Sequence, residues 1–281
     1  MLNATQADLT VQGGSVQAAQ VVALKAAQSI NLTASASNES NRSSNSSSAA
    51  SLGVSVGIGE GSAGFSADVA ASRGKGQANA DSTTYNNSHI SAGQQLTLDS
   101  GSDTTLRGAT VSAPQVVANV GRNLNLESLQ DTASSQATQH STGVTASVPL
   151  TGSGGNAGIN LAKQNSESQY RSVFEQSGIQ AGDGGFQITV QGKTDLKGAV
   201  IASQADASLN TLQTATLTTS HISNSMSASA SSSGLSAGTG MLDGKYAASK
   251  AIAGNLLNHG DASQSDNSLV CPAPHGQRVK H

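Results

Sequence analysis

The amino-acid sequence predicts an all-β fold, a right-handed parallel β-helix (solenoid) with β-hairpin excursions and a short helical segment near the C-terminus. Three observations favour it over a compact domain. A unit of about 90 residues recurs, the apolar residues form runs of only three to five, and aromatic residues make up 2% of the 281 residues. Because large apolar side chains supply most of the burial energy of a compact core, these features indicate a thin, elongated core of Val, Leu, Ile and Ala.

A shared glycine marks the repeat. Residues 105–113 read TLRGATVSA and residues 195–203 read DLKGAVIAS, with a weaker copy, TVQGGSVQA, at residues 10–18. The glycines, Gly13, Gly108 and Gly198, lie 95 and 90 positions apart. We expect a tight corner at Gly108 and Gly198 that needs a positive φ or a close approach between neighbouring chain segments.

The first half of each unit consists of short apolar runs separated by Gly, Asn, Asp and Ser. Strands this short are typical of a solenoid, in which each coil stacks on the next at a spacing of about 4.8 Å. Leu106 and Leu126 are 20 positions apart, about one three-sided coil. Eight residues that recur in these runs are predicted to face inward: Leu98, Leu106, Val111, Val117, Leu124, Leu126, Leu196 and Ile201.

The second half of each unit begins with serine-rich sequence and then alternates apolar and small polar residues. Residues 53–71 and 143–161 each contain two alternating runs joined by a glycine-rich turn, which predicts β-hairpins with one apolar face. These patterns divide the chain into a partial first repeat with a Ser-rich linker (1–48), a second unit (49–138, strands within 88–128), a third unit (139–230, strands within 177–218) and a degenerate repeat with an irregular tail (231–281, possible helix 244–257).

Composition excludes some functions. The net charge is −3 without a basic stripe, so the electrostatic footprint of a nucleic-acid-binding protein is absent. The single cysteine, Cys271, excludes an internal disulfide framework. The first residues lack a basic region followed by an apolar run, and no stretch of 18 apolar residues occurs, so we expect no signal peptide in this chain.

Two segments spell the pattern of a serine-hydrolase nucleophile, Gly53–Gly57 around Ser55 and Gly234–Gly238 around Ser236. The repeat places both at one position of the unit, where the middle copy has Thr145. A catalytic serine has no need of such duplication, and small residues that alternate along a strand explain the pattern. We therefore expect no catalytic residue and no enzyme activity.

Residues 59–64 match the dinucleotide-binding fingerprint, with Asp81 at a suitable distance beyond. That mechanism requires a helix, whereas residues 65–71 alternate with the period of a strand, so no cofactor is expected. We also expect no metal site. No two of the six histidines are close enough in sequence to suggest a zinc site: His89, His140, His221, His259, His275 and His281. Four aspartates at turn-like positions could bind calcium, but the glycine–aspartate nonapeptide that builds such sites is not repeated around them: Asp99, Asp103, Asp183 and Asp195.

The order and spacing of several segments resemble the haemagglutinin-repeat region of two-partner-secretion exoproteins, the filamentous-haemagglutinin and contact-dependent growth-inhibition group. The resemblance covers most of residues 8–240 and rests on these segments: His89–Gly93, Leu96–Leu98, Gly101–Ala113, Val116–Val120, Asn123–Asp131, Glu175–Ile179, Ala181–Phe186 and Thr194–Ser203.

The resemblance implies a non-enzymatic structural or adhesive segment of a large secreted or cell-surface protein. Its implied partners are a dedicated outer-membrane transporter and the surface of a host or target cell. An alternative within the same group is a region that delivers a toxin during contact-dependent growth inhibition, and a distant alternative is a β-helix polysaccharide lyase. Because the chain starts almost directly on a strand-like run at Asp8–Val11, we also expect possible end-to-end self-association.

Overall fold

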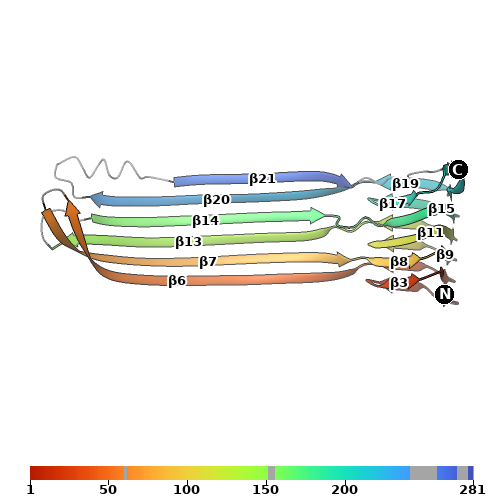
Figure 1. The fold of residues 1–281 in the computed structure, drawn as a ribbon, viewed down its shortest axis with the longest axis horizontal. Helices are drawn as coiled ribbons and strands as arrows, with labels where there is room; N and C mark the ends of the chain where they lie inside the picture. Colours follow the sequence, from red (N-terminus) through yellow and green to blue (C-terminus); the bar gives the residue numbers. More distant parts are fainter. Residues whose placement is uncertain (60–61, 151–155, 241–257, 271–277, 281) are drawn as a thin grey trace.

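The computed structural model describes residues 1–59, 62–150, 156–240, 258–270 and 278–280. In this part of the chain the protein is almost entirely β-structure, with one 3₁₀ turn at Ala207–Leu209. No helix in these ranges is long and apolar enough to cross a membrane. The expected helix at 244–257 lies outside the described residues. A solenoid of stacked parallel strands forms one end of the molecule, and a long antiparallel sheet projects from it (Figure 1).

Two parallel sheets form the solenoid. Six of its strands make one sheet: β2 (Leu9–Gln12), β5 (Ile30–Thr33), β10 (Thr104–Arg107), β12 (Leu124–Glu127), β16 (Lys193–Lys197) and β19 (Thr216–Ser220). Ten strands make the other: β1 (Leu2–Ala4), β3 (Ser15–Ala18), β4 (Val21–Ala26), β8 (Ser88–Ala92), β9 (Gln95–Ser100), β11 (Ala109–Val120), β15 (Gly178–Val190), β17 (Val200–Ser203), β18 (Thr211–Gln213) and β22 (Arg278–Lys280).

The coil length agrees with the sequence expectation. Leu106 pairs with Leu126 in parallel register, one coil of 20 residues later. Each coil passes through one strand of the six-stranded sheet and then twice through the ten-stranded sheet. In β11, for example, the first part pairs with β8 and the second part with β9, and both parts pair with β15 of the other neighbouring coil. The all-β, β-helix-like architecture is confirmed.

Aliphatic side chains fill the interior of the solenoid. Seven of the eight predicted inward residues are fully buried or nearly so, including Leu98, Leu106 and Leu196. The prediction for Val117 is wrong, because this residue is only half-buried while its neighbours Val116 and Ala118 are buried. Successive residues of a strand point to opposite faces, and the register of β11 directs Val116 inward.

The projecting antiparallel sheet, called the blade from here on, contains the longest strands of the molecule. The strand order in the sheet is β21-β20-β14-β13-β7-β6. Three hairpins form it: β6 with β7, β13 with β14, and β20 with β21. The hairpins are much longer than 53–71 and 143–161, and the expected serine-rich linker lies inside β6. The strands are β6 (Ser35–Gly59), β7 (Ser62–Asn86), β13 (Asp131–Pro149), β14 (Asn156–Ser172), β20 (Ile222–Gly240) and β21 (Asn258–Val270).

The spacing of the coils explains why three separate hairpins form one sheet. A hairpin follows every second strand of the six-stranded sheet, namely β5, β12 and β19. Two coils rise by about 9.6 Å, and the two strands of a hairpin are also about 9.6 Å wide. Each hairpin therefore meets the next at hydrogen-bonding distance, as β7 meets β13 and β14 meets β20. One unit of the repeat is two coils and one hairpin.

Glycine makes the corner of the coils that carry no hairpin. Gly13, Gly108 and Gly198 have φ values of 57°, 63° and 56°, which confirms the predicted corner. A Cβ atom on Gly108 would lie 2.6 Å from the Cβ atom of Ala34. Both the backbone conformation and the neighbouring coil therefore require glycine at this position.

Buried serines complete the hydrogen bonding where a hairpin leaves the coil. Ser128 donates from its hydroxyl to the carbonyl of Gly198 (2.7 Å) and accepts from the backbone N–H of Ser177 (2.8 Å). The hydroxyl of Ser177 in turn accepts from the N–H of Ala109 (3.2 Å). A chain that turns out of the coil leaves backbone groups without strand partners, and these hydroxyls satisfy them.

Candidate functional site

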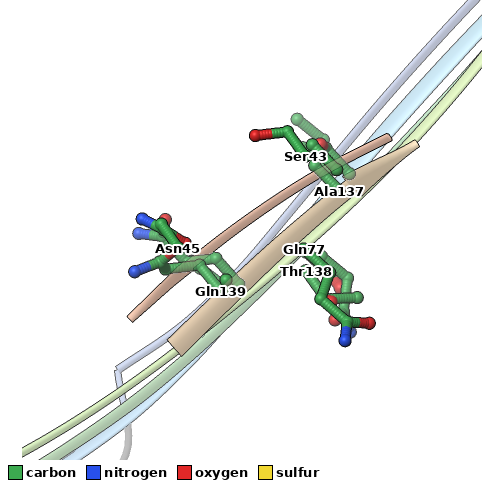
Figure 2. A pocket seen from close by; sticks show the side chains of 15 residues that line it. Ser43, Asn45, Gln77, Ala137, Thr138 and Gln139 are labelled. Atoms are coloured by element: carbon green, nitrogen blue, oxygen red, sulfur yellow. The ribbon is translucent and has the colours of Figure 1, made fainter. Parts of the chain in front are cut away.

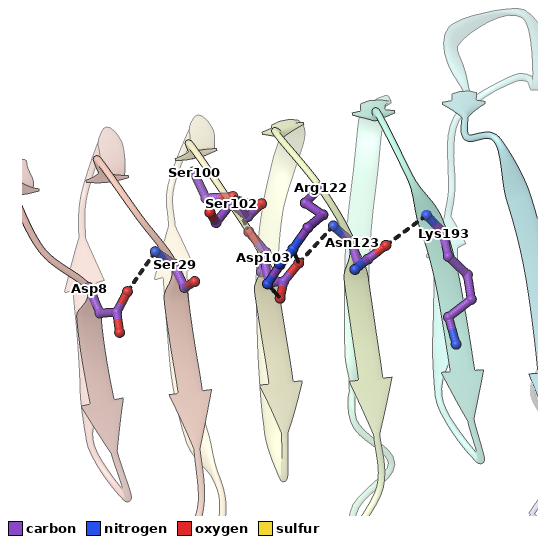
Figure 3. Close-up of polar contacts among 9 residues, drawn as sticks. Asp8, Ser29, Ser100, Ser102, Asp103, Arg122, Asn123 and Lys193 are labelled. Carbon is purple, nitrogen blue, oxygen red and sulfur yellow. Dashed lines mark hydrogen bonds and ion pairs between the residues drawn. The ribbon is translucent and has the colours of Figure 1, made fainter.

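Polar side chains form a ladder along one corner of the solenoid, immediately before the strands of the six-stranded sheet (Figure 3). Asp8 accepts a hydrogen bond from the backbone N–H of Ser29 (2.8 Å), and Asp103 accepts one from Asn123 (3.0 Å). The side-chain oxygen of Asn123 accepts from the N–H of Lys193 (3.0 Å). These contacts link neighbouring coils at this corner, in addition to the backbone pairing of the strands.

The candidate calcium-binding aspartates Asp99, Asp103 and Asp195 are engaged with other side chains. Asp99 pairs with Lys25 (2.7 Å), and Asp195 accepts a hydrogen bond from Thr218. Arg122 donates to Asp103 from Nε (2.8 Å), and this hydrogen bond lowers the pKa of Asp103.

A second charged cluster joins three solenoid strands of the six-stranded sheet. Burial is the largest single effect on Glu127 and by itself would raise the pKa of this carboxyl. Hydrogen bonds and attraction from the positive charges of Lys197 and Arg107 together outweigh the effect of burial, so the pKa of Glu127 is lowered. Lys197 and Arg107 contact Glu127 at 2.8 and 3.1 Å. Glu127 is therefore paired with cations of both neighbouring strands.

The histidines are scattered through the fold. His89 contacts Thr110 (2.9 Å) and Glu175 (3.5 Å), while His140 and His221 are exposed. His259 lies in β21, and His275 and His281 are outside the described residues. Across the described ranges, no three His, Cys, Asp or Glu side chains come together in a way that could hold a metal ion.

The two serine motifs lie in the blade. Ser55 is part of β6, and Ser236 is exposed on β20, where it pairs with Asn160 of β14. Of the glycine-rich segment 59–64, Gly59 ends β6 and residues 62–64 begin β7, so a strand follows where a dinucleotide site needs a helix. The described residues of these motifs lie on strands, without the strand-to-helix turn that a nucleophile motif requires.

One face of the blade carries a shallow groove of about 680 Å³ (Figure 2). Its floor is a single row of small residues that crosses all six strands: Ser43, Ala78, Ala137, Ser166, Ala230 and Ala262. Asn45 and Gln139 stand beside this row, while Gln77 and Thr138 lie on the opposite side of the sheet. No titratable side chain lines the groove, so it offers hydrogen bonds but no acid–base chemistry.

The other face of the blade ends in an apolar surface far from the solenoid. Directly paired residues of an antiparallel sheet lie on the same face, and the registers place the apolar residues of four strands, β6, β7, β13 and β14, together. Their exposed fractions range from 40% to 82%. We call these residues the apolar tip: Leu52, Val54, Phe65, Val69, Val144, Val148, Leu150, Ile159 and Leu161.

The apolar tip is as large as the largest exposed apolar patches of soluble proteins. Four strands at about 4.8 Å, with four steps of about 6.6 Å between same-face residues along the strands, give an area of about 500 Å². Apolar patches of this size on soluble proteins commonly mark interaction surfaces. The same strands carry glycine and small polar residues on the opposite face, so only one side is apolar.

Cationic residues lie next to the apolar tip on the same face. Lys75 and Lys163 occupy one row of cross-strand pairs, with His140 between them, and Arg73 lies one row closer to the tip. The three cations, Arg73, Lys75 and Lys163, are called the cationic row. These three residues and His140 are exposed, and no ion pair joins Arg73, Lys75 or Lys163 to a carboxylate among the residues the structure describes. Like charges gathered on one face of a sheet repel each other, so these three cations favour an anionic partner.

Sequence reasoning missed the cationic row, although it predicted hairpins with an apolar face. Lys75 and His140 are 65 positions apart in the chain, and only the pairing of β7 with β13 brings them together. The alternating pattern gives the face of each residue within one strand. It does not give the register between two hairpins.

Comparison with known proteins establishes the family. The model of the hemagglutinin repeat matches residues 1–146, about half of the chain. The chain belongs to the hemagglutinin-repeat family. The matched part of this hemagglutinin-repeat chain includes the whole first hairpin and most of β13.

Several large proteins contain similar hemagglutinin-repeat sequence. A deoxyribonuclease CdiA of Yersinia pseudotuberculosis serotype O:3 (strain YPIII) is 40% identical over 221 residues, which cover 79% of this chain and 20% of that protein. Toxin CdiA of Escherichia coli is 37% identical over 249 residues, which cover 88% of this chain and 8% of that protein. The hemagglutinin-repeat chain thus spans a fifth or less of these relatives. No solved structure matches it significantly.

Proposed function

We propose that this hemagglutinin-repeat chain is a non-enzymatic structural and adhesive segment of a large secreted surface protein. The solenoid supplies a rigid scaffold, and the blade supplies the contact surface. One observation carries the proposal: the apolar tip lies at the far end of the blade, away from the solenoid. A surface on a long projection is the first part of the molecule to meet another surface.

The setting of the proposal follows from the relatives. They are many times longer than this chain, so the repeat region is one part of a larger protein. We infer export through an outer-membrane transporter of the two-partner type and contact with a host or target cell. We also infer that the solenoid is right-handed, since crossover connections between parallel strands of one sheet almost always are.

A cell-binding measurement tests the adhesive function. The fluorescently labelled chain is incubated with bacterial and epithelial cells, and bound protein is measured. We expect Val54→Ser with Val148→Ser, both in the apolar tip, to reduce binding at least tenfold. The matched control, Gln136→Ser with Gln169→Ser, changes exposed polar residues nearer the solenoid and keeps full binding. Equal binding by both variants would contradict adhesion through the tip.

The polysaccharide-lyase alternative gains no support from the structure. Lyases of this fold gather acids and bases in one cleft, and the groove on the blade is lined by neutral side chains. The charged clusters of the solenoid are ion pairs between neighbouring coils. We therefore assign no reaction to this segment.

A second candidate is toxin delivery during contact-dependent growth inhibition. Relatives named as toxins, among them Toxin CdiA of Yersinia pestis, contain similar sequence. The observation that favours this function is the position of the apolar tip beside the cationic row. Such an arrangement suits an anionic lipid surface, because the apolar residues can enter the acyl region while the lysines contact the lipid phosphates.

Vesicle flotation separates the two functions. Delivery predicts that the chain floats with vesicles containing anionic lipid and less with zwitterionic ones. Lys75→Gln with Lys163→Gln should then reduce flotation, whereas Lys193→Gln, in the solenoid, should not. Binding to cells without flotation supports adhesion to a specific receptor, and flotation that depends on both the tip and the lysines supports delivery.

A further inference from the structure

The shallow groove on the blade lies in the middle of the sheet (Figure 2). Its floor of small residues passes through Ala78 of β7, Ala137 of β13 and Ser166 of β14. Each of these three strands has a hydrogen-bonded neighbour on both sides. The groove is therefore a property of the face of the sheet and not of its edges.

A row of amide side chains borders this floor on the side toward the apolar tip. Gln139 lies directly opposite Gln164 on one side and Gly76 on the other, and Gly76 lies opposite Asn45. A Cβ atom on Gly76 would overlap both Oε1 of Gln139 and Oδ1 of Asn45. The two amides thus lean over Gly76 from the strands on either side, and the glycine leaves them the room to do so.

These amide groups have hydrogen-bonding capacity that the fold does not use. In the part of the chain that the structure describes, the side chains of Asn45, Gln139 and Gln164 make no hydrogen bond to another residue. Each amide offers two N–H donors and one oxygen acceptor. A ligand in the groove can therefore both donate to this row and accept from it.

The groove is electrically neutral. Its lining consists only of Ser, Thr, Ala, Gly, Asn and Gln, and the nearby Lys75 and Lys163 lie on the opposite face, in the row that contains His140. A charged ligand would lose hydration here without gaining an opposite charge. The groove is therefore complementary to an uncharged ligand.

The shape of the groove favours a linear ligand rich in hydroxyl groups. The floor crosses six strands at a spacing of about 4.8 Å, which gives a length of about 24 Å. An extended peptide typically binds by adding a strand to an open edge, whereas the strands in the middle of this floor are already paired on both sides. Sugar hydroxyls both donate and accept hydrogen bonds, and sugar C–H groups can pack on the alanine methyl groups.

We propose that this groove binds an uncharged linear oligosaccharide. The amides of Asn45, Gln139 and Gln164 hydrogen-bond its hydroxyl groups, and its rings lie on the floor around Ala137. Gly76 is a positioning residue, because it lets two of the amides lie close to the sheet. The groove is on the opposite face from the apolar tip, so this binding goes beyond adhesion through the tip and does not depend on it.

Binding of the whole chain to immobilised oligosaccharides tests the proposal. The probes are linear hexasaccharides of glucose, mannose and N-acetylglucosamine, with a heparin hexasaccharide as the charged probe and an uncharged extended peptide as the protein-like probe. We expect at least one neutral hexasaccharide to bind. Asn45→Ala with Gln139→Ala should weaken this binding at least tenfold, and Ala137→Leu, which fills the floor, should do the same.

The matched control removes the same two residue types from the opposite face. Asn79→Ala with Gln136→Ala should leave oligosaccharide binding unchanged, since both side chains are exposed on the other side of β7 and β13. Gly76→Ala keeps both amides but displaces them, so it should weaken binding as well. Circular dichroism checks that each variant is folded.

Three results would overturn the proposal. These are the absence of binding to all three neutral hexasaccharides, binding that the groove variants do not weaken, and preference for heparin or the peptide. Val54→Ser with Val148→Ser, the variant of the apolar tip, should bind the oligosaccharide normally. Its behaviour separates a failure of the groove from a failure of adhesion through the tip.

Discussion

A side chain at Gly108 is predicted to destabilise the solenoid because of both backbone and packing. The φ of +63° costs an L-residue about 1–2 kcal/mol relative to glycine. A Cβ atom would also lie 2.6 Å from that of Ala34 and 2.8 Å from Cδ1 of Leu129, an overpacking that typically costs about 1–3 kcal/mol. Gly108→Val should therefore lower the free energy of unfolding by about 2–5 kcal/mol.

Thermal unfolding followed by circular dichroism measures the effect. At about 2 °C per kcal/mol for a chain of this size, the Tm should fall by about 4–10 °C. Gly198→Val, at the same position of the next unit, should behave alike. The matched control is Gly143→Val in β13, where the nearest atom to a new Cβ lies at 3.9 Å and the backbone is extended. The Tm of this control should change by no more than about 2 °C.

Equal losses of Tm at Gly108, Gly198 and Gly143 would refute this reasoning, since they would show that the corner has no special conformation. Gly143 is a suitable control because the structure gives both its backbone conformation and its surroundings.

Three further predictions concern single side chains. Ser128→Ala, which leaves the carbonyl of Gly198 and the N–H of Ser177 without their partner, should cost about 1–3 kcal/mol in chemical unfolding, whereas the exposed Ser135→Ala should cost almost nothing. The pKa of Asp103 is lowered in the folded chain, so its stabilising effect is present above its ordinary value of 3.8 and is lost as the pH falls through the folded pKa. Asp103→Asn should thus weaken the acid dependence of stability below about pH 4, and an unchanged profile would contradict the Arg122 pairing. Ser55→Ala and Ser236→Ala should leave the Tm unchanged, and labelling of either serine by a fluorophosphonate would contradict their assignment as strand residues.

The sequence was most informative about the solenoid. Apolar runs with a spacing of 20 residues gave the coil length, and the recurring glycine gave the corner at Gly108. Both features arise within one coil, where neighbouring residues and the local backbone decide the outcome. The choice between Val116 and Val117 was different, because two adjacent valines are equivalent in the pattern and only the register of β11 distinguishes them.

The blade was underestimated for a physical reason. Serine has little intrinsic preference for strands, so residues 40–48 did not indicate one. Pairing over most of the length of β6 and β7 overrides this weak local preference. The cationic row depends in the same way on pairing between hairpins that are distant in the sequence, so no local pattern contains it.

The most direct test concerns the central claim that successive hairpins join into one sheet. Asn79 of β7 lies directly opposite Gln136 of β13, on the same face, whereas Ala137 lies on the other face. On a Cys271→Ser background, Asn79→Cys with Gln136→Cys should form an intramolecular disulfide readily, because opposite residues in a sheet lie about 4.5–5.5 Å apart. Asn79→Cys with Ala137→Cys should not. Failure of the first pair, or equal oxidation of both, would show that the hairpins project independently and would contradict the account.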